Sequence, residues 1–341
     1  LSKQIKEFKV KNIIITNKNS YLILKKKFKK LNITNNLDKI DEIINSKVDY
    51  TMSAISGFNG LKPTIKIIKK TKTIAIANKE SIICGWSLIK KQINKYKTKF
   101  IPVDSEHFSI WSVIKNLDPK TIDQIVITAS GGPFFKLKNK KIKKTPKLAT
   151  NHPNWKMGKK ISTDSATLMN KVFEVIEAQK IFDINLNKFK ILIHPKSYIH
   201  AIVKFKNGLI KLVAHDTDMK IPIFNSIYYD TDNYFETKRI NINLLNDLKL
   251  NKVDVKKYPL VNILKNIPKK NTLFETLLVS VNDELVSLFL QNKISFEDIS
   301  LKLKQIINLK ELLKYRQKKV KNLTQIEKLN EFVRLKTKSL S

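Results

Sequence analysis

The sequence predicts a mixed α/β protein that opens with a doubly wound parallel sheet, continues with a second α/β region and ends in a helical bundle. Three observations predict this class. Short apolar runs alternate with amphipathic patterns in the first hundred residues, further strands follow up to residue 215, and apolar residues recur at helical spacing after residue 259. We expect four regions, with bounds 1–102, 103–228, 229–257 and 258–341.

The first hundred residues show a β/α rhythm. The expected strands are Val10–Thr16, Tyr50–Ser56 and Thr73–Ala77, and the expected helices are Ser20–Leu31, Leu37–Ser46 and Gly60–Lys70. This alternation is typical of parallel strands joined by crossover helices. A Gly-rich phosphate turn of the G-x-G-x-x-G type does not occur, and the chain begins at Leu1, inside an apparent helix, instead of at Met. We therefore expect the amino terminus to be incomplete.

The second region combines strands with one long helix. The expected strands are Lys99–Val103, Ile122–Ala129, Phe189–His194, Ile199–Lys206 and Leu209–His215, and the expected helix runs from Ser165 to about Phe182. The polar, Asn-rich stretch from Asp230 to Lys257 predicts a linker. After Pro259, helical spacing of leucines predicts the carboxyl-terminal helices, as at Leu273, Leu277, Leu278, Leu285 and Leu288.

Charge and composition exclude some classes of protein. The net charge is +37, which first indicates nucleic acid, but only three of the 66 cationic residues are arginines and the lysines are spread over the whole chain. We interpret this as a compositional bias that favours anionic substrates, with a basic nucleic-acid-binding protein as the alternative. No apolar run approaches the roughly 18 residues of a membrane span. The single cysteine, Cys84, favours a reducing cytoplasm.

Three carboxylates predict a metal site. Asp104 and Glu106 follow the expected strand Lys99–Val103, and in an extended chain they would face the same way. Glu174 on the later helix supplies a third hard oxygen ligand, and without a plausible cysteine set the three favour Mg²⁺ or Mn²⁺ over zinc. The alternatives are an exposed acidic turn and an ordinary amphipathic helix.

Two further segments predict an anion site. Ser165 and Thr167 offer capping hydroxyls at the expected helix start, and helical spacing places Asn170, Glu174 and Glu177 on one side, next to Lys171. A helix start with hydroxyls, an amide and a lysine suits a phosphate. The turn Ser130-Gly131-Gly132 after a strand favours an anion nest.

A polar loop at 151–158 carries Trp155 and Met157, which predicts a lid that closes over a ligand. The alternative is a loop packed on the core. His194, His200 and His215 form a weaker metal candidate, because histidines in apolar strands are more often packed and hydrogen-bonded. A Ser105/His107/Asp104 hydrolase is disfavoured since neighbouring side chains on a strand diverge.

Taken together, five ordered motifs resemble the 1-deoxy-D-xylulose 5-phosphate reductoisomerase family. They are Ala77-Asn78-Lys79-Glu80-Ser81, Pro102-Val103-Asp104-Ser105-Glu106-His107, Ala129-Ser130-Gly131-Gly132-Pro133-Phe134, His152-Pro153-Asn154-Trp155-Lys156-Met157-Gly158 and Asp164-Ser165-Ala166-Thr167 with Met169-Asn170-Lys171. The resemblance covers Tyr50 to about Ile223 strongly. It implies an incomplete Rossmann-like NADPH domain, an α/β catalytic domain, and conversion of deoxyxylulose phosphate with NADPH to 2-C-methyl-D-erythritol 4-phosphate.

The resemblance also implies site residues. Asp104, Glu106 and Glu174 would be catalytic and would hold Mg²⁺ or Mn²⁺ together with the substrate, and Lys79 would share in proton movement. Phosphate binding would fall to Ser130, Ser165, Asn170 and Lys171, with His152 nearby, while Ser105 and Lys79 orient the hydroxyls. Trp155 and Met157 would belong to the lid over the substrate. Asn78, Glu80 and Gly158 would lie at the cofactor.

Some positions depart from the family pattern. The Gly-Ser/Thr-Gly turn for the pyrophosphate has no counterpart, Phe58 and Asn59 replace small residues after Gly57, and Val172 replaces a glycine. We expect Val172 to add bulk beside the phosphate pocket. A degenerate homologue that binds a sugar phosphate and metal without this activity is therefore a second alternative. The resemblance implies a homodimer, and we expect no nucleic-acid or membrane partner.

Overall fold

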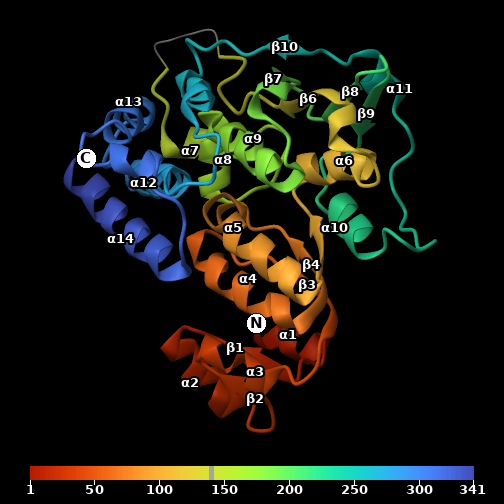
Figure 1. Cartoon of the computed structure of the whole chain (residues 1–341), viewed down its shortest axis with the longest axis vertical. Helices are drawn as coiled ribbons and strands as arrows, with labels where there is room; N and C mark the ends of the chain where they lie inside the picture. Colours follow the sequence, from red (N-terminus) through yellow and green to blue (C-terminus); the bar gives the residue numbers. More distant parts are fainter. Residues whose placement is uncertain (138–141) are drawn as a thin grey trace.

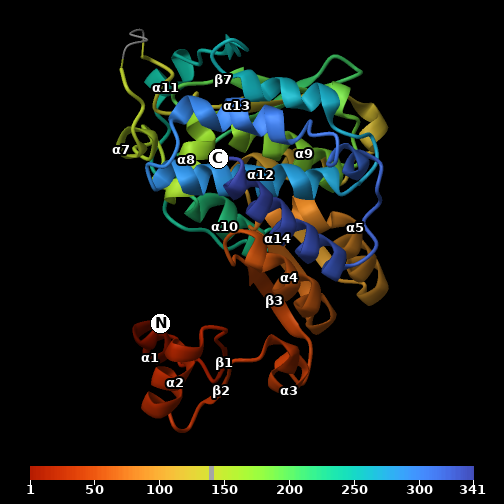
Figure 2. The same cartoon turned by 90° about the vertical axis from the view of Figure 1, so that its left-hand side faces the viewer.

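The chain begins with two small parallel sheets in place of the single sheet that the sequence predicts. The computed structural model describes residues 1–137 and 142–341. Strands β1 (Asn12–Ile14) and β2 (Asn32–Thr34) pair in parallel, and β3 (Val48–Ser53), β4 (Thr71–Ile76) and β5 (Lys99–Pro102) form a second parallel sheet in that order. Figures 1 and 2 show the first sheet and its short helices standing apart from the rest of the molecule.

The predicted β/α rhythm of this half is confirmed. Its helices are α1 (Ser2–Glu7), α2 (Lys18–Lys27), α3 (Ile40–Ile43), α4 (Leu61–Ile67) and α5 (Lys79–Tyr96). Helix α5 starts just after β4, where the Asn78 side chain caps it by accepting a hydrogen bond from the Ser81 N–H at 2.6 Å. The first turn of α5 therefore lies at the carboxyl ends of the parallel strands, where α/β proteins bind their ligands.

A mixed five-stranded sheet forms the second α/β region. Its strand order is β10-β7-β6-β8-β9, with β6 (Ile122–Ala129), β7 (Phe189–Ile193), β8 (Ile199–Phe205), β9 (Ile210–Ala214) and β10 (Asn251–Lys252). Only β6 and β7 are parallel neighbours. The segment 229–257, expected to be a linker, contributes the edge strand β10 and the helix α11 (Ile242–Asn246). Strands of two residues show no period, so the sequence gives no signal for β10.

The sequence predicts only one helix around this sheet, and the described residues form five. They are α6 (Ser105–Ile114), α7 (Pro146–Ala149), α8 (Lys159–Ala166), α9 (Met169–Phe182) and α10 (Lys220–Ile227). The helix expected from Ser165 to Phe182 is instead the end of α8 followed by α9. Buried Leu168 adopts a left-handed conformation with φ +60°, which interrupts the helix between them. Ser165 consequently lies at the end of α8 and not at a helix start.

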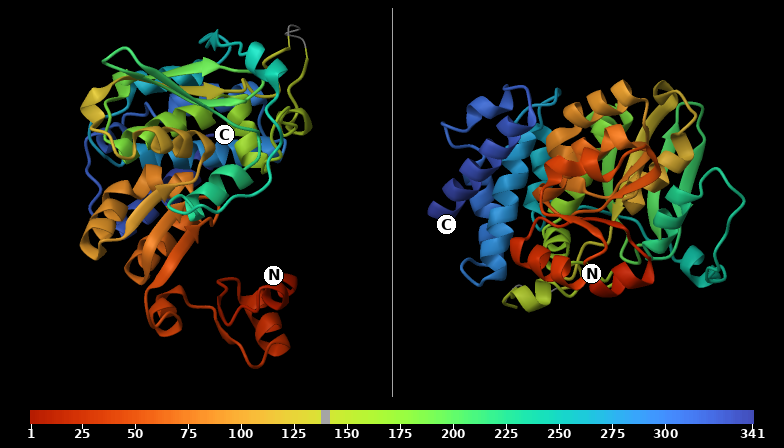
Figure 3. Two further views of the ribbon diagram at one scale, coloured as in Figure 1. Left: turned by 90° about the vertical axis from the view of Figure 1, so that its right-hand side faces the viewer. Right: turned by 90° about the horizontal axis from the view of Figure 1, so that it is seen from below.

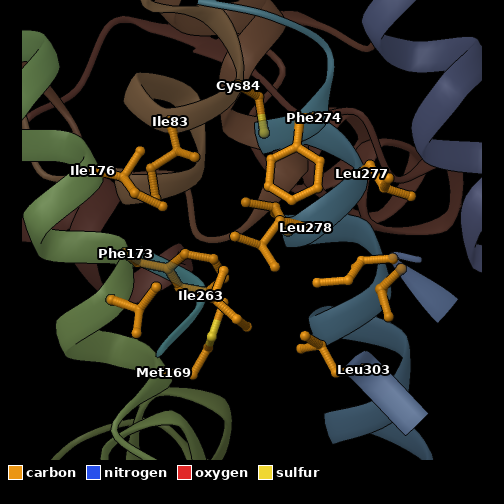
Figure 4. Packing of buried hydrophobic residues seen from close by; sticks show 14 of the residues in the cluster. Ile83, Cys84, Met169, Phe173, Ile176, Ile263, Phe274, Leu277, Leu278 and Leu303 are labelled. Atoms are coloured by element: carbon orange, nitrogen blue, oxygen red, sulfur yellow. The ribbon is translucent and has the colours of Figure 1, made fainter. Parts of the chain in front are cut away.

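The carboxyl-terminal helices are confirmed as α12 (Phe274–Leu290), α13 (Phe296–Ile306) and α14 (Leu323–Ser339). Figure 4 shows Phe274 and Leu278 of α12 packed toward Phe173 and Ile176 of α9, with Ile83 of α5 completing the contact. Burying each such side chain contributes roughly 1.5–3 kcal/mol. This core fixes α5, α9 and α12 as one unit. Figure 3 shows the carboxyl terminus at the outer edge of the larger part of the molecule and the amino terminus in the separate first unit. Within the described residues, no helix has both the length and the apolar character needed to cross a bilayer.

Candidate active site

One cavity gathers every residue that the sequence analysis assigns to substrate, metal or cofactor. It has a volume of about 470 Å³ and lies where β3, β4 and β6 end, between α5, α6, α8 and α9. The predicted residues that line it are Asn78, Lys79, Glu80, Asp104, Ser105, Glu106, Ser130, His152, Trp155, Gly158, Ser165, Asn170, Lys171 and Glu174. A larger cavity of about 1070 Å³, beside α5 and the end of α9, contains none of them. The chemistry therefore points to the smaller cavity.

The three carboxylates meet, although the local structure differs from the prediction. Asp104 does not continue an extended strand; it caps α6, and its Oδ1 accepts a hydrogen bond from the Glu106 N–H at 3.3 Å. Aspartate is a strong helix N-cap, which explains the turn. One ligand oxygen each from Asp104, Glu106 and Glu174 lies within 4.8 Å of the other two. Hard oxygen donors at this spacing fit Mg²⁺ or Mn²⁺.

Two lysine ammonium groups lie among these carboxylates. Lys79 Nζ is 3.1 Å from Asp104 Oδ2 and 3.1 Å from Glu174 Oε1. Lys171 Nζ is 2.6 Å from Glu106 Oε1 and 2.5 Å from Glu174 Oε2. The two ammonium groups thus offset the negative charge of the three carboxylates. A bound metal cation would offset the same charge.

The pKa values follow from burial and these neighbours. Burial alone would lower the pKa of Lys79, but Asp104 and Glu174 outweigh it and hold this pKa well above its usual value. Burial would raise the pKa of Asp104, yet Lys79 and His107 hold it well below its usual range. Burial, followed by the charge of Glu106, raises the pKa of Glu174. Lys79 is therefore a hydrogen-bond donor at neutral pH.

The backbone of the Ser130-Gly131-Gly132 turn, which follows β6, lies close to the backbone at the end of α8. Ser130 Oγ lies 2.9 Å from His152 Nε2 and accepts a hydrogen bond from the Gly132 N–H at 3.0 Å. A Cβ at Gly132, whose φ is +68°, would lie 2.7 Å from the carbonyl oxygen of Ser165. Only glycine allows the Ser130 turn and Ser165 to line the same part of the cavity. The Gly132 N–H is satisfied by Ser130, so the backbone nest is not fully free for an anion.

The expected lid is held over the cavity by its own histidine. His152 Nδ1 accepts hydrogen bonds from the backbone N–H groups of Asn154 at 3.2 Å and Trp155 at 3.0 Å. The Asn154 amide donates to the Pro195 carbonyl at 2.7 Å. Trp155 packs edge-on against His200, with ring centroids 6.0 Å apart. Burial, followed by the charge of Lys171, lowers the pKa of His152 to about 4, so this ring is neutral at pH 7.

The residues expected at the cofactor come from the start of α5 and from the end of the lid. The Asn78 amide donates to the carbonyls of Ile55 and Gly57, the latter at 2.8 Å, and thereby ties the turn after β3 to the start of α5. Glu80 pairs with Lys160 at 2.7 Å. Gly158 precedes α8, and nothing lies within 4 Å of a Cβ placed there.

The structure corrects the expectation for Val172 and agrees with the preferred interpretation of the strand histidines. Val172 is fully buried in the core and does not line the cavity, so it adds no bulk beside the anion site. Among the described residues, only Asp104, Glu106 and Glu174 form a group of His, Cys, Asp or Glu side chains close enough to hold a metal ion, and the histidines form none. His200 and His215 are instead stacked, with ring centroids 3.7 Å apart.

The sequence led us to consider His107 only in a disfavoured hydrolase triad, and to assign no role to Glu177. His107 is fully buried; its Nε2 lies 2.8 Å from the Glu174 carbonyl oxygen, and its Nδ1 lies 3.4 Å from Asp104 and 3.6 Å from Glu177. Because the carbonyl accepts, Nε2 carries a proton. His107 thus bridges two helices that supply metal-ligand candidates. The helical spacing of Glu177 from Glu174 was a signal, but the partner of Glu177 is visible only in three dimensions.

Hard oxygen ligands in a lysine-rich cavity at the ends of parallel strands are the chemistry of an α/β enzyme that uses a divalent cation on a small anionic substrate. Comparison with known proteins narrows this class. The chain belongs to the 1-deoxy-D-xylulose 5-phosphate reductoisomerase family. Three family models match it: 1-deoxy-D-xylulose 5-phosphate reductoisomerase at residues 1–85, its C-terminal domain at 100–182 and the DXP reductoisomerase C-terminal domain at 215–336.

Curated relatives and solved structures agree with the family models. The chain is 57% identical to the 1-deoxy-D-xylulose 5-phosphate reductoisomerase of Pelagibacter ubique (strain HTCC1062), over 100% of this chain and 89% of the relative. It is 37% identical to that of Sulfurihydrogenibium sp. (strain YO3AOP1), over 88% and 78%.

The fold matches the Zymomonas mobilis reductoisomerase solved with NADPH (TM-score 0.88, 30% identity, 100% of this chain and 88% of the other). It also matches a DOX-P reductoisomerase solved with NADPH, fosmidomycin and magnesium (TM-score 0.90, 28% identity, 99% and 87%). The predicted α/β fold class and family are confirmed.

Proposed function

We propose that this protein converts 1-deoxy-D-xylulose 5-phosphate and NADPH to 2-C-methyl-D-erythritol 4-phosphate, a step of the non-mevalonate isoprenoid pathway, with the help of a divalent cation. The observation that carries the proposal is the meeting of Asp104, Glu106 and Glu174 in a cavity with every other predicted site residue. Membership of the reductoisomerase family at 57% identity supports the same reaction.

In this proposal Asp104, Glu106 and Glu174 hold Mg²⁺ or Mn²⁺. When bound, the divalent cation supplies Lewis-acid polarisation of the substrate's carbonyl oxygen. Glu174 is only 1% exposed, so its carboxylate is desolvated and is stabilised by positive charge at the site. His107 positions two of the ligands: it faces the Asp104 carboxylate and hydrogen-bonds the Glu174 backbone.

The phosphate of the substrate would be bound by Ser130, Ser165, Asn170 and Lys171, with His152 beside them. Neutral His152 accepts at Nδ1, so its Nε2–H donates to Ser130 and orients that hydroxyl. Lys171 is buried and cationic, because Glu106 and Glu174 raise its pKa against the effect of burial. A buried ammonium with a hydroxyl set suits a phosphate dianion.

Lys79 and Ser105 would orient the hydroxyl groups of the substrate. Lys79 Nζ donates to Asn170 Oδ1 at 3.0 Å, and Ser105 Oγ donates to Glu106 Oε2 at 2.6 Å. Both donors therefore lie among the proposed metal ligands, where the reacting carbons would be held. Lys79 stays protonated there, so it can give a proton to a developing alkoxide.

NADPH would lie along the carboxyl ends of β3 and β4, near Asn78, Glu80 and Gly158. The chain positions that line the cavity on this side are 54–57 after β3 and 77–80 after β4. Ligands of parallel sheets bind at such strand ends. Trp155 and Met157 line the same cavity and would exclude water during hydride transfer.

We further propose a homodimer that acts in the cytoplasm. Strand β9 is an edge strand, and its region exposes Leu209, Ile210 and Leu212 by 59%, 61% and 45%. Apolar edge strands are stabilised by pairing with a second chain. The one cysteine, Cys84, cannot form an internal disulfide and is buried, which suits a reducing compartment. The bounds 1–102, 103–228, 229–257 and 258–341 remain our proposed domain division.

The test combines activity with binding. The protein is incubated with 1-deoxy-D-xylulose 5-phosphate, Mg²⁺ and NADPH, and the loss of NADPH absorbance is followed with calorimetry of substrate binding in parallel. We expect oxidation that requires both substrate and metal. Metal-dependent binding without oxidation would favour a degenerate homologue, and the absence of both would overturn the proposal. Salt-dependent binding to duplex DNA that ignores Glu174→Ala would favour the nucleic-acid alternative.

A further inference from the structure

A buried ionic cluster joins the lid to the cofactor side of the cavity and to the carboxyl-terminal helices. Lys160 Nζ lies 2.7 Å from Glu80 Oε1, 3.2 Å from Asp164 Oδ2 and 3.0 Å from Asp283 Oδ1. The three acids belong to three helices, α5, α8 and α12 respectively. One ammonium group therefore bridges elements that are far apart in the sequence.

A hydrogen bond next to this cluster also connects α12 to α8. The Asn282 amide, which is fully buried, donates to Asp164 Oδ1 at 2.8 Å. Helix α12 thus contacts α8 at two adjacent positions, through Asn282 and through Asp283. The ammonium of Lys160 also lies 5.6 Å from the centroid of the Phe173 ring on α9. The cluster holds α8 against α5, α9 and α12 together.

The charges of the cluster are unbalanced without Lys160. Among the residues that the structure describes, no other lysine or arginine lies within ion-pair distance of Glu80, Asp164 or Asp283. The side chains of the three acids are between 2% and 11% exposed. Buried carboxylates that lose their only cation repel one another and move toward water. The position of Lys160 therefore determines where Glu80 and the start of α8 lie.

The cluster is placed to orient the lid. Lys160 is the second residue of α8, and the lid residues 151–158 end immediately before this helix. The other end of the lid is held by His152 at Ser130. Glu80, Lys160 and Asp164 themselves line the cavity.

We propose that Lys160, fixed by Asp283 of the carboxyl-terminal helices, is a positioning residue that sets the orientation of the lid and of Glu80 toward the bound cofactor. The inference rests on the proposed function for its kinetic part. It assigns the carboxyl-terminal helical region a role in substrate and cofactor binding, although none of its residues lines the cavity. The region acts through one ion cluster.

The test uses Asp283→Asn, because Lys160→Met leaves three buried acids without a cation and is expected to unfold part of the chain. Asp283→Asn removes the tie to α12 and leaves Lys160 with Glu80 and Asp164. Its matched control is Glu284→Gln, the next residue of α12, whose carboxylate pairs with Arg334 of α14 at 3.0 Å and lies away from the cavity. A charge-preserving variant, Lys160→Arg, tests whether geometry matters beyond charge.

Two readouts separate positioning from stability. Hydrogen exchange of the ligand-free protein should become about tenfold faster at the amides of 152–162 in Asp283→Asn, and should not change there in Glu284→Gln. The KM values for substrate and NADPH should rise about tenfold in Asp283→Asn and in Lys160→Arg, while Glu284→Gln keeps both within about twofold. A purely structural role would lower the melting temperature without shifting KM.

The outcomes are distinguishable from a failure of the proposed function. If the wild-type protein oxidises no NADPH, the function fails, and the exchange of 152–162 still decides the inference. If the wild type is active and Asp283→Asn keeps wild-type exchange and KM values, or if Glu284→Gln shows the same changes, the positioning role of Lys160 is wrong.

Discussion

Lys171 Nζ lies 2.5 Å from Glu174 Oε2, one helical turn along α9, so the lysine proposed for the phosphate is held by a carboxylate proposed for the metal. A divalent cation that takes up the Glu174 carboxylate would release Lys171 toward the anion. The metal and phosphate sites therefore share one interaction, and linkage makes their affinities reciprocal.

This relationship predicts that metal and substrate bind with positive coupling. Mg²⁺ should strengthen the binding of 1-deoxy-D-xylulose 5-phosphate about tenfold or more, and the substrate should strengthen Mg²⁺ binding by the same factor. In Lys171→Gln the substrate should bind more weakly and the coupling should shrink. Calorimetric titrations in both orders measure the two factors. Equal coupling in Lys171→Gln and the wild type would contradict the shared interaction.

Gly132→Ala should damage the anion site through the backbone of Ser165. The new Cβ would lie 2.7 Å from the Ser165 carbonyl oxygen at a residue with φ +68°, so both strain and collision are expected. We expect the substrate KM to rise about tenfold. Gly208→Ala is the control: its φ is +89°, but nothing lies within 4 Å of the added Cβ. It should cost about 1 kcal/mol of stability and leave KM unchanged.

His152 should make the lid sensitive to acid. Its Nδ1 accepts two backbone hydrogen bonds from the lid, and a proton on this nitrogen would abolish both. Burial, with Lys171, lowers the pKa of His152 to about 4, below its usual 6.5. The stabilisation by the neutral ring is therefore present above pH 6.5 and is lost as pH falls through 4.

The check is hydrogen exchange of the lid amides of Asn154 and Trp155 between pH 7 and pH 4, corrected for intrinsic rates. Protection should decrease with acid in the wild type. In His152→Asn, whose side-chain oxygen replaces Nδ1 as acceptor without titrating in this range, protection should be independent of pH. If protection in the wild type does not change on acidification, the acceptor role of Nδ1 is wrong.

His107→Phe should destabilise the fold by about 1–3 kcal/mol, because it removes the hydrogen bond to the Glu174 carbonyl and leaves the carboxyl group of Glu177, whose pKa burial raises to about 8, without a partner. Adding Glu177→Gln should recover part of this loss. The free energy of unfolding, measured with urea, tests both variants. A loss below about 1 kcal/mol would show that the buried pair contributes little.

The same pair predicts a loss of stability in alkali. Burial would lower the pKa of His107, but Glu177 and Asp104 outweigh it and raise the pKa to about 9. A raised pKa means that the stabilisation is complete below pH 6.5 and is lost as pH rises through 9. The unfolding free energy of the wild type should fall over this range, and that of His107→Phe should fall less.

The sequence predicts the fold class well and the element boundaries less well. Short apolar runs identify β3, β4, β6 and β8, because these strands are long enough to show a pattern, whereas the long helix α5 was not predicted. The sequence carries no signal for the interruption of the helix at Leu168. The left-handed conformation is usually adopted by glycine or asparagine, and a buried leucine seldom adopts it. Strand β1 lies within the predicted strand Val10–Thr16, but β2 and β10 are too short for a pattern, so the separate first sheet and the edge strand at β10 were not predicted.

The site shows the same division. Short motifs identify the residues that line the cavity, because each motif places its side chains by local geometry. Asp104 was assigned to an extended chain, yet its capping of α6 brings the carboxylates together all the same. His107 and Lys160 depend on partners that lie more than 60 positions away, such as Glu177 and Asp283. Pairings of this kind arise from tertiary packing and leave no local pattern.

The measurement that tests the central claim most directly is calorimetric binding of 1-deoxy-D-xylulose 5-phosphate with and without Mg²⁺, in the wild type and in Glu174→Gln. Removing one of three hard ligands should weaken Mg²⁺ binding by about 100-fold and abolish the metal-dependent gain in substrate affinity. Glu297→Gln, an exposed acid paired with Lys144, is the control and should behave as the wild type. If Glu174→Gln binds Mg²⁺ and substrate as the wild type does, the three carboxylates do not form the metal site and the account is contradicted.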